Sequence, residues 1–123
     1  MPPLTPQQVE DFAAELQRER DDLAEQGRRT ATELADVRAA RSDGSADDEH
    51  DPEGSTLSSD WSRLYGFSRA ITERVEAIER AIARIDEGTY GVCIRCGRQI
   101  ETGRLEARPA AELCIECARE VGR

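Results

Sequence analysis

Apolar side chains recur at helical spacing in two long stretches of the chain, residues 5–41 and 58–87. In the second stretch they alternate steps of three and four residues, which is the a/d pattern of a coiled-coil seam. The seam covers four heptads and includes one polar position: Trp61, Leu64, Ser68, Ile71, Val75, Ile78, Ile82 and Ile85. Ser58 or Ser59 suits the start of a helix and Gly88 suits its end. The pattern therefore predicts one long amphipathic helix over residues 58–87.

The first stretch carries a matching seam that is most apolar near its beginning. Thr5 suits an N-cap and Pro6 the first helical turn. The seam positions are Val9, Phe12, Leu16, Glu19, Leu23, Gln26, Thr30 and Glu33. Antiparallel helices pair positions whose residue numbers have a constant sum, and a sum of 94 aligns both seams, from Val9–Ile85 to Glu33–Trp61. We therefore expect a mainly α protein with an antiparallel coiled-coil hairpin over residues 5–87, about 36 Å along its seam, and a tip loop at 42–57.

Pairing between two chains is the alternative to a hairpin, because amphipathic helices with heptads commonly dimerise. The short linker and the matched seams favour pairing within one chain, so we expect a monomer. Composition agrees with an elongated form. Aromatic residues make up only 4% of the chain and the mean hydropathy is −0.69, which excludes a sizeable globular core and calls for another source of stability.

Four cysteines near the end of the chain offer that source. Cys93 and Cys96 form one CxxC pair, and Cys114 and Cys117 form a second pair after 17 intervening residues. Two such knuckles can fold together into a tetrahedral four-thiolate zinc site. Two disulfides would need an oxidising compartment, and redox-active dithiols are a weaker alternative. We expect one structural Zn²⁺, since a fourth cysteine ligand leaves no open catalytic position.

The negative charge is concentrated in one segment. The chain has a formal net charge of −9, and residues 42–60 contain seven acids and no base. A protein that binds DNA through phosphate contacts would not normally have this distribution. No apolar run is long enough to cross a membrane, and the N-terminus carries no signal peptide, so the expected location is the cytoplasm. No nucleophile–base set or phosphate-binding glycine loop supports an enzyme.

The cysteine-containing segment resembles the DksA/TraR family of bacterial transcription regulators. It reads Gly-Thr-Tyr-Gly-Val-Cys-Ile-Arg-Cys-Gly from residue 88, Arg-Leu-Glu-Ala-Arg-Pro from 104 and Leu-Cys-Ile-Glu-Cys from 113. The resemblance implies a zinc-finger base at residues 88–123 that bears the coiled coil. It also implies direct binding to RNA polymerase without contact to promoter DNA. In that family the coiled coil enters the secondary channel of the polymerase, and its acidic tip modulates initiation near the active site.

Two departures from the family limit what the resemblance implies. The family tip motif, Asp-x-x-Asp-x-Ala, is matched at Asp48 and Asp51 only after a shift of two places, and Glu53 then stands where alanine belongs. We take Asp48, Asp51 and Glu53 as the candidate tip residues. Of the basic positions that contact the nucleotide ppGpp in the family, two fall on Ala77 and Ala118, and only Arg108 is retained. Binding of ppGpp is therefore not expected.

A few further residues admit two interpretations. Arg104, Glu106 and Arg108 could contact the polymerase or brace the finger, and the Leu105/Ala107 alternation between them suggests a short strand. Trp61 could pack in the seam or bind a partner. Residues 118–123 suggest a short terminal helix.

The alternative functions are a sequence-specific DNA-binding zinc finger, which the charge disfavours, and a thiol redox sensor that releases zinc on oxidation.

Overall fold

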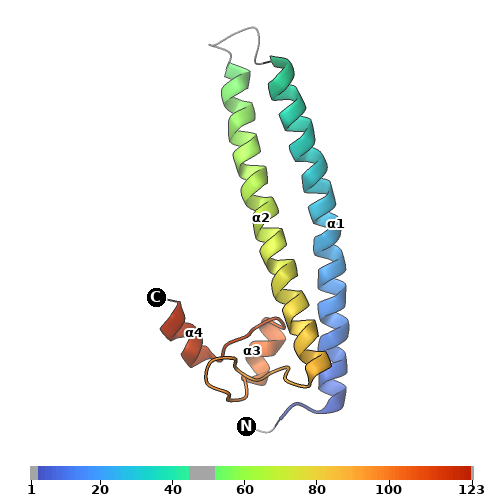
Figure 1. Cartoon of the computed structure of the whole chain (residues 1–123), viewed down its shortest axis with the longest axis vertical. Coiled ribbons are helices and arrows are strands. Elements are labelled where there is room, and N and C mark those ends of the chain that lie inside the picture. The colour runs from blue at the N-terminus through green and yellow to red at the C-terminus, as the bar shows by residue number, and fades with distance from the viewer. Residues whose placement is uncertain (1–2, 45–51, 123) are drawn as a thin grey trace. The chain divides into compact units, whose positions relative to one another are not determined.

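A computed structural model describes residues 3–44 and 52–122, without the side chains of residues 41–44 and 52–57. It contains four helices in this range: α1 (Pro6–Gly44), α2 (Pro52–Glu87), α3 (Thr102–Ala107) and α4 (Ile115–Val121). The chain divides into a base unit, Met1–Asp21 with Glu76–Arg123, and an arm unit, Asp22–Val75. Within each unit, the segments of the long helices α1 and α2 run antiparallel and side by side (Figure 1). The mainly helical fold expected from the sequence is confirmed.

The N-terminus of α1 is held by a capping box. The Thr5 hydroxyl accepts a hydrogen bond from the Gln8 backbone N–H at 3.1 Å, and the Gln8 side-chain oxygen accepts one from the Thr5 N–H at 2.8 Å. These two bonds satisfy backbone donors that have no partner within the helix. The assignment of Thr5 as N-cap is therefore confirmed, with Pro6 at the first helical position.

The long helices extend further than the sequence pattern indicated. α1 continues to Gly44 and α2 already begins at Pro52, so both enter the segment expected to form a loop at 42–57. Proline is tolerated at the first position of a helix because its missing N–H would have no helical partner there. Asp48 and Asp51 lie outside the described residues, and only the helical backbone of Glu53 is described.

α2 ends in a Schellman motif. The Gly88 N–H donates to the Ile85 carbonyl at 3.2 Å, and the Thr89 N–H donates to the Arg84 carbonyl at 2.8 Å. Gly88 has a φ of +80°, the left-handed conformation that this motif requires. The helix stop expected at Gly88 is confirmed, and the chain turns there toward the first cysteine knuckle.

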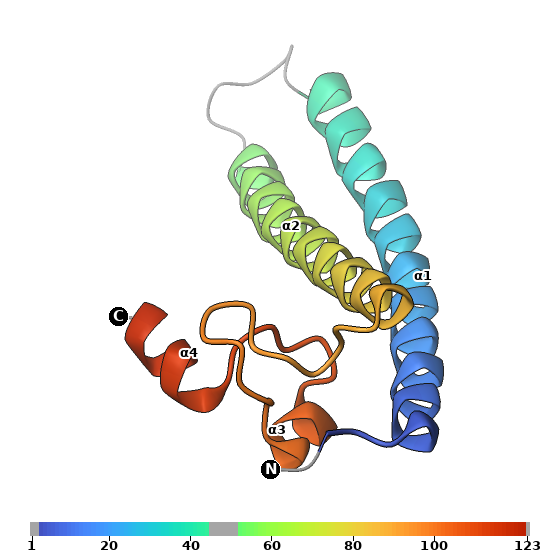
Figure 2. The same ribbon diagram turned by 60° about the horizontal axis from the view of Figure 1, so that its bottom comes forward.

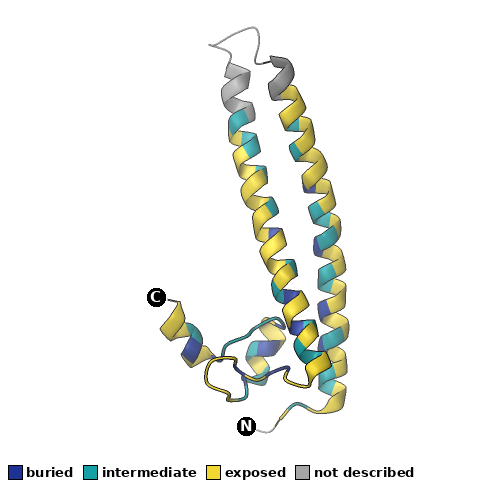
Figure 3. Cartoon of the chain, in the orientation of Figure 1, coloured by how far each residue is buried: buried dark blue, intermediate teal, exposed yellow. Residues whose placement is uncertain are grey.

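The base unit buries the first layers of the seam. Phe12, Leu16, Ile78 and Ala81 are buried, and the buried positions of α1 and α2 lie on the sides of the helices that face each other (Figure 3). Complete burial of a leucine or isoleucine side chain stabilises a fold by about 1.5–3 kcal/mol. The two long helices of this unit are therefore held by a compact aliphatic and aromatic seam.

The arm unit has a thinner seam. Leu23, Ile71 and Thr30 are buried, and the Thr30 hydroxyl donates to the Gln26 carbonyl in its own helix at 2.9 Å. Gly27 lies against Ile71, because a Cβ built at Gly27 would be 3.5 Å from Ile71 Cγ2. Two-helix arms bury one narrow stripe, so most of their surface stays in contact with water.

One seam position was predicted incorrectly in the arm. Glu33 is exposed, whereas Leu34 and Val37 are half-buried. The spacing from Leu23 to Leu34 is eleven residues, which matches the natural 3.6-residue turn better than a strict heptad does. On α2, Trp61 and Leu64 are half-buried as expected of seam residues, and the Trp61 ring stacks on Tyr65 with centroids 5.0 Å apart.

Two short helices and the loops that join them follow α2 in the base unit (Figure 2). Residues 102–107 form helix α3, so the strand suggested by the Leu105/Ala107 alternation is wrong. A three-residue alternation cannot distinguish strand from helix, and Leu105 alone is buried here. The terminal helix is confirmed as α4. None of the described helices combines the length and the apolar character needed to cross a membrane.

Candidate metal centre

The four cysteines converge on one point of the base unit. The sulfur atoms of Cys93, Cys96, Cys114 and Cys117 all lie within 4.8 Å of one another. Cys96 Sγ and Cys114 Sγ are 3.8 Å apart. A tetrahedral zinc site with Zn–S bonds of about 2.3 Å places its sulfurs about 3.8 Å apart. The donor set and its spacing therefore fit Zn²⁺.

The first knuckle is a tight turn stabilised by backbone hydrogen bonds. The Cys93 N–H donates to the Arg98 carbonyl at 2.8 Å, and the Gly97 N–H donates to the Cys93 carbonyl at 2.9 Å. Val92 and Gln99 form an antiparallel bridge across the same turn. Gly97 has a φ of +76°, a conformation that residues with a Cβ rarely adopt. This turn brings Cys93 and Cys96 to the same side of the backbone.

The second knuckle leads directly into α4. Cys114 occupies the N-cap position with extended backbone angles, and its carbonyl accepts the Ala118 N–H at 2.9 Å. Cys117 lies in the first turn of the helix. The Ile94 N–H donates to the Glu112 carbonyl at 2.9 Å. This bond joins the two knuckles next to their first cysteines, so the sulfurs are positioned by backbone contacts as well as by sequence spacing.

Two thiols of the cluster have pKa values shifted in opposite directions. Burial disfavours the Cys93 thiolate, but backbone N–H groups of Cys114, Cys96 and Arg95 lower the pKa of Cys93 to about 6. Burial and the neighbouring cysteine side chains raise the pKa of Cys117 to about 12. Four adjacent sulfurs cannot all become anionic unless a cation shares the space between them. Binding of a divalent metal therefore accompanies full deprotonation of this cluster.

Gly91 lets the N-terminal segment approach the first knuckle. Gly91 has a φ of +86°, and a Cβ built there would be 2.9 Å from Leu4 Cδ1 and 3.1 Å from Gln99 Nε2. The sequence alone gave no sign of this contact between Gly91 and Leu4. Leu4 immediately precedes the N-cap Thr5, the position from which a hydrophobic side chain often anchors the start of a helix.

Tyr90 connects the finger to α1. Its hydroxyl donates to the Pro109 carbonyl at 2.7 Å, and its ring centroid lies 5.7 Å from that of Phe12. Burial raises the pKa of Tyr90, which keeps the phenol neutral and able to donate. Tyr90 is three residues before Cys93 in the chain, so the coil and the metal cluster share a short rigid connection.

A second connection joins α2 to the loop before Cys114. Arg80 Nε lies 2.6 Å from Glu112 Oε1, and Arg84 Nη1 lies 3.6 Å from the same oxygen. The side-chain hydrogen bond and charge of Glu112 raise the pKa of Arg80. Neither the two arginines nor Glu112 could be assigned from sequence spacing, because they are brought together only by the fold.

The three candidate contact residues, two on α3 and one directly after it, differ in their surroundings. Arg104 is half-buried and its Nε donates to the Leu113 carbonyl at 2.8 Å, which braces the segment leading to Cys114. Glu106 and Arg108 are exposed. Arg108 follows the last residue of α3, and its backbone N–H donates to the Arg104 carbonyl at 2.7 Å. The structure thus places Arg104 within the finger and the other two on its surface.

Comparison with known proteins agrees with this geometry. Residues 88–121 match the family described as the prokaryotic dksA/traR C4-type zinc finger. The chain carries a DksA/TraR zinc finger. A protein of Aquifex aeolicus, described as uncharacterized, is 48% identical over 60 residues, which cover 49% of this chain and 41% of that protein. The RNA polymerase-binding transcription factor DksA of Escherichia coli K12 is 42% identical over 43 residues, 35% of this chain and 28% of DksA. The alignments with these relatives thus cover about two fifths of their length or less.

Solved structures extend the similarity to the whole fold. The transcription factor DksA2 of Pseudomonas aeruginosa has a TM-score of 0.78 and 23% identity, and the match covers 95% of this chain and 84% of that one. An RNA polymerase binding protein of Chlamydia trachomatis gives a TM-score of 0.54 at 19% identity, over 98% and 93% of the two chains. The DksA-like fold of two long helices and a four-cysteine finger is therefore confirmed, together with one structural Zn²⁺ in the finger.

Proposed function

We propose that this protein is a regulator of transcription that binds RNA polymerase directly, in the manner for which its DksA relatives are named. The observation that carries the proposal is the combination of a DksA/TraR finger at residues 88–121 with a DksA2-like fold over 95% of the chain. A C4 zinc finger alone occurs in many kinds of protein. A C4 finger attached to an antiparallel coiled coil of this type is far more specific.

The surface of the arm unit supports binding to a protein. Tyr65 and Phe67 are 46% and 52% exposed, although the whole chain contains only five aromatic residues. Because they are two residues apart, their directions around the helix axis differ by about 200°, and they lie on nearly opposite sides of α2. Exposed aromatic side chains are enriched in protein interfaces, where they often carry much of the binding energy. A partner that contacts both would enclose the arm, as a channel does.

The acidic segment supplies the second part of the proposal. By the family resemblance, the arm enters the secondary channel of the polymerase, and Asp48, Asp51 and Glu53 act near the catalytic centre to change the lifetime of open complexes. The protein acts as a monomer, contributes no catalytic group of its own and does not bind a specific DNA sequence. In this chain the family positions that contact ppGpp hold the half-buried Ala77 and Ala118 and the exposed Arg108, so we do not include that nucleotide in the proposed mechanism.

The test is a binding titration of fluorescently labelled protein with purified RNA polymerase, followed by in vitro transcription. We expect saturable binding to the polymerase and no binding to promoter DNA alone at moderate salt. A shift of bare promoter DNA with no polymerase binding would replace this proposal with a DNA-binding finger.

A double substitution at the tip separates binding from regulation. Asp51→Asn with Glu53→Gln should leave polymerase affinity nearly unchanged and remove most of the effect on open-complex lifetime. Glu33→Gln with Asp36→Asn is the matched control, because it removes the same two charges from exposed positions on α1. Equal effects of the two double variants would show that only net charge matters and that the tip carboxylates have no special role.

A further inference from the structure

We propose that the arm unit contains a weak section, where α1 and α2 separate locally while the layer formed by Leu23 and Ile71 stays closed. The weak section comprises residues 24–33 of α1 and 65–70 of α2. Three features mark it, and all lie within the arm unit: an interrupted seam, a buried polar side chain and two helical glycines. The inference rests on the packing of the arm alone and does not require the proposed binding to RNA polymerase.

The aliphatic seam is interrupted along the weak section. Beyond Leu23 and Ile71, the next leucine, isoleucine or valine side chains that are at least half-buried are Leu34 and Leu64. At 1.5 Å per residue, the gaps are about 16 Å on α1 and about 10 Å on α2. The weak section therefore lacks the aliphatic contacts that hold the two helices together on either side of it.

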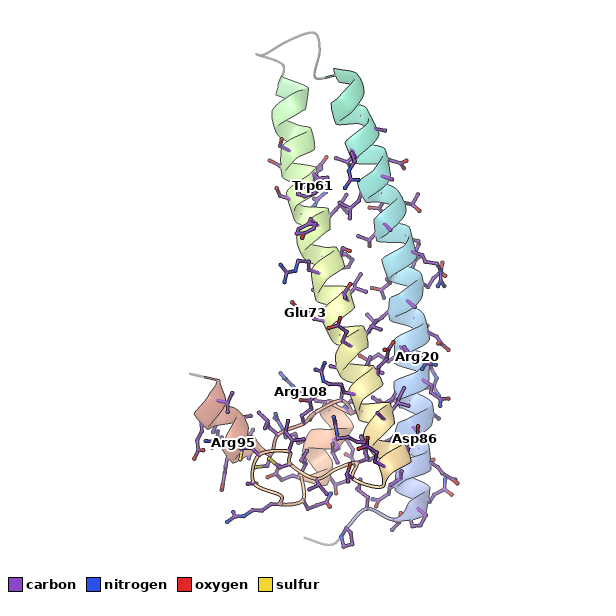
Figure 4. All side chains as sticks on the ribbon, in the orientation of Figure 1. Arg20, Trp61, Glu73, Asp86, Arg95 and Arg108 are labelled. Carbon is purple, nitrogen blue, oxygen red and sulfur yellow. The ribbon has the colours of Figure 1, made fainter. Side chains whose placement is uncertain are left out.

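Polar side chains take the seam positions in this gap. Thr30 is only 4% exposed, and Gln26 and Ser68 are half-buried. Ser68 lies along α2 between Trp61 and Glu73, which are labelled in Figure 4. The Thr30 hydroxyl donates to the Gln26 carbonyl at 2.9 Å, so this bond stays within α1 and does not join the two helices. A threonine bonded to the carbonyl four residues earlier slightly destabilises its helix and often bends it.

Each long helix also carries a glycine in the weak section, and packing requires neither. A Cβ built at Gly66 would meet nothing within 4 Å, and one built at Gly27 would lie 3.5 Å from Ile71 Cγ2, an ordinary van der Waals contact. Neither glycine has a positive φ. Glycine inside a helix is less stable than alanine because the unfolded chain has more freedom to lose. Both helices thus lose stability in the same section without gaining a contact.

These features together predict opening in the weak section. A region with few buried apolar contacts opens at a lower free energy than the rest of a fold. Opening here breaks only thin, partly polar packing, whereas opening at Leu23 and Ile71 exposes two buried aliphatic side chains. The outer part of the arm, which leads to the acidic segment, therefore changes its shape while the inner layers remain closed.

The experiment is amide hydrogen exchange of the zinc-loaded full chain, measured residue by residue by NMR under conditions where the rate reports the opening equilibrium. Outer-arm amides, at residues 28–38 and 58–66, should exchange together as one group. They should exchange about tenfold or more faster than inner amides at residues 16–23 and 75–82, the ratio expected for one missing buried aliphatic side chain. One common rate for both groups, or a gradual increase toward the end of the arm, would overturn the proposal.

Substitutions in the two units show whether the outer arm opens independently. Gly27→Ala with Gly66→Ala should slow outer-arm exchange about 25-fold, about fivefold for each glycine. Ile78→Val, at a buried position of the base unit, should accelerate the inner amides roughly two- to twelvefold and leave outer-arm rates unchanged. Gly103→Ala is the matched control, because its Cβ would also meet nothing within 4 Å and it lies in α3. An equal acceleration of both groups by Ile78→Val, or equal outer-arm rates in the parent and the double glycine variant, would refute independent opening.

A pair of threonines tests the polar seam position. Thr32 makes the same kind of bond as Thr30, from its hydroxyl to the Arg28 carbonyl at 3.1 Å, but it is exposed. Thr30→Val places an apolar side chain in the gap, so it should slow outer-arm exchange relative to Thr32→Val, which reports the loss of such a bond alone. Equal rates in the two variants would show that seam polarity does not weaken this section, and the proposal would fail.

Discussion

Gly91 offers a test of how tightly the N-terminal segment packs on the finger. Gly91→Ala introduces two penalties. The left-handed conformation costs a residue with a Cβ about 1–2 kcal/mol, partly offset by about 0.4–1 kcal/mol from the lower entropy of the unfolded chain. The new methyl would also lie 2.9 Å from Leu4 Cδ1 and 3.1 Å from Gln99 Nε2, and overpacking of this kind costs about 1–3 kcal/mol.

Gly88→Ala is the comparison variant, because it carries the conformational penalty without the overpacking penalty. Its φ is +80°, yet a Cβ built there would meet nothing within 4 Å. We therefore expect Gly88→Ala to lower the free energy of unfolding by about 1 kcal/mol and Gly91→Ala by about 2–4 kcal/mol. The assay is denaturant unfolding followed by circular dichroism, with all variants at the same free zinc concentration because bound metal contributes to stability.

A double-mutant cycle identifies Leu4 as the cause. Leu4→Ala removes the closest atom, so the effect of Gly91→Ala should become smaller in that background by about 0.5 kcal/mol or more, the size of coupling found between residues in contact. If Gly91→Ala and Gly88→Ala are equally destabilising, and the cycle shows no coupling, then Leu4 does not pack against the knuckle and the reasoning fails.

Three other predictions concern the metal, the arm seam and the arm surface. Replacing any of the four cysteines by serine should abolish stoichiometric zinc, measured by elemental analysis, and unfold the finger, since structural zinc contributes on the order of 10 kcal/mol; a folded finger without zinc would contradict this. Leu23→Ala should destabilise the protein by about 2–4 kcal/mol because Leu23 is buried, whereas Gly66→Ala should stabilise it by up to about 1 kcal/mol because its Cβ would meet nothing within 4 Å; thermal unfolding of both variants tests the pair. Phe67→Ala should change stability by less than about 0.5 kcal/mol, and Tyr65→Ala should destabilise the protein by about 0.5–1.5 kcal/mol because its ring stacks on Trp61. Each should weaken polymerase binding in the titration, with exposed Thr72→Ala as control; unchanged binding in both would exclude the arm aromatics from the interface.

The sequence predicted most where a regular period or a fixed spacing determines the structure. Every seam position assigned on α2 is buried or half-buried, because a continuous helix repeats its buried face at known intervals. The two CxxC pairs predicted the metal centre because thiolate zinc requires four sulfurs at short range. The sequence assigned Glu33 to the α1 seam, whereas in the structure Leu34 lies there. The heptad count missed this shift because it ignores the slow drift of a 3.6-residue helix.

Contacts between distant segments could not be predicted. Leu4 and Gly91, or Arg80 and Glu112, come together only when the helices and the finger fold against each other. Residues 102–107 show a related limit: their apolar alternation is too short to fix the backbone, and the helix forms with Leu105 as its buried residue. The bracing of the metal centre therefore depends on tertiary structure, whereas its ligands can be identified from spacing.

Because Tyr90 links the finger to the coiled coil, zinc binding to the finger should also stabilise the coil. Tyr90 touches Phe12 of α1, bonds the Pro109 carbonyl and precedes Cys93 by three residues. A metal that binds only the folded finger stabilises everything that folds together with it, by an amount that rises with the logarithm of free metal concentration. The first turns of α1 contain no cysteine, yet their hydrogen-exchange protection should follow the zinc concentration. Zinc supply would thus set how much of the protein has a properly anchored coil.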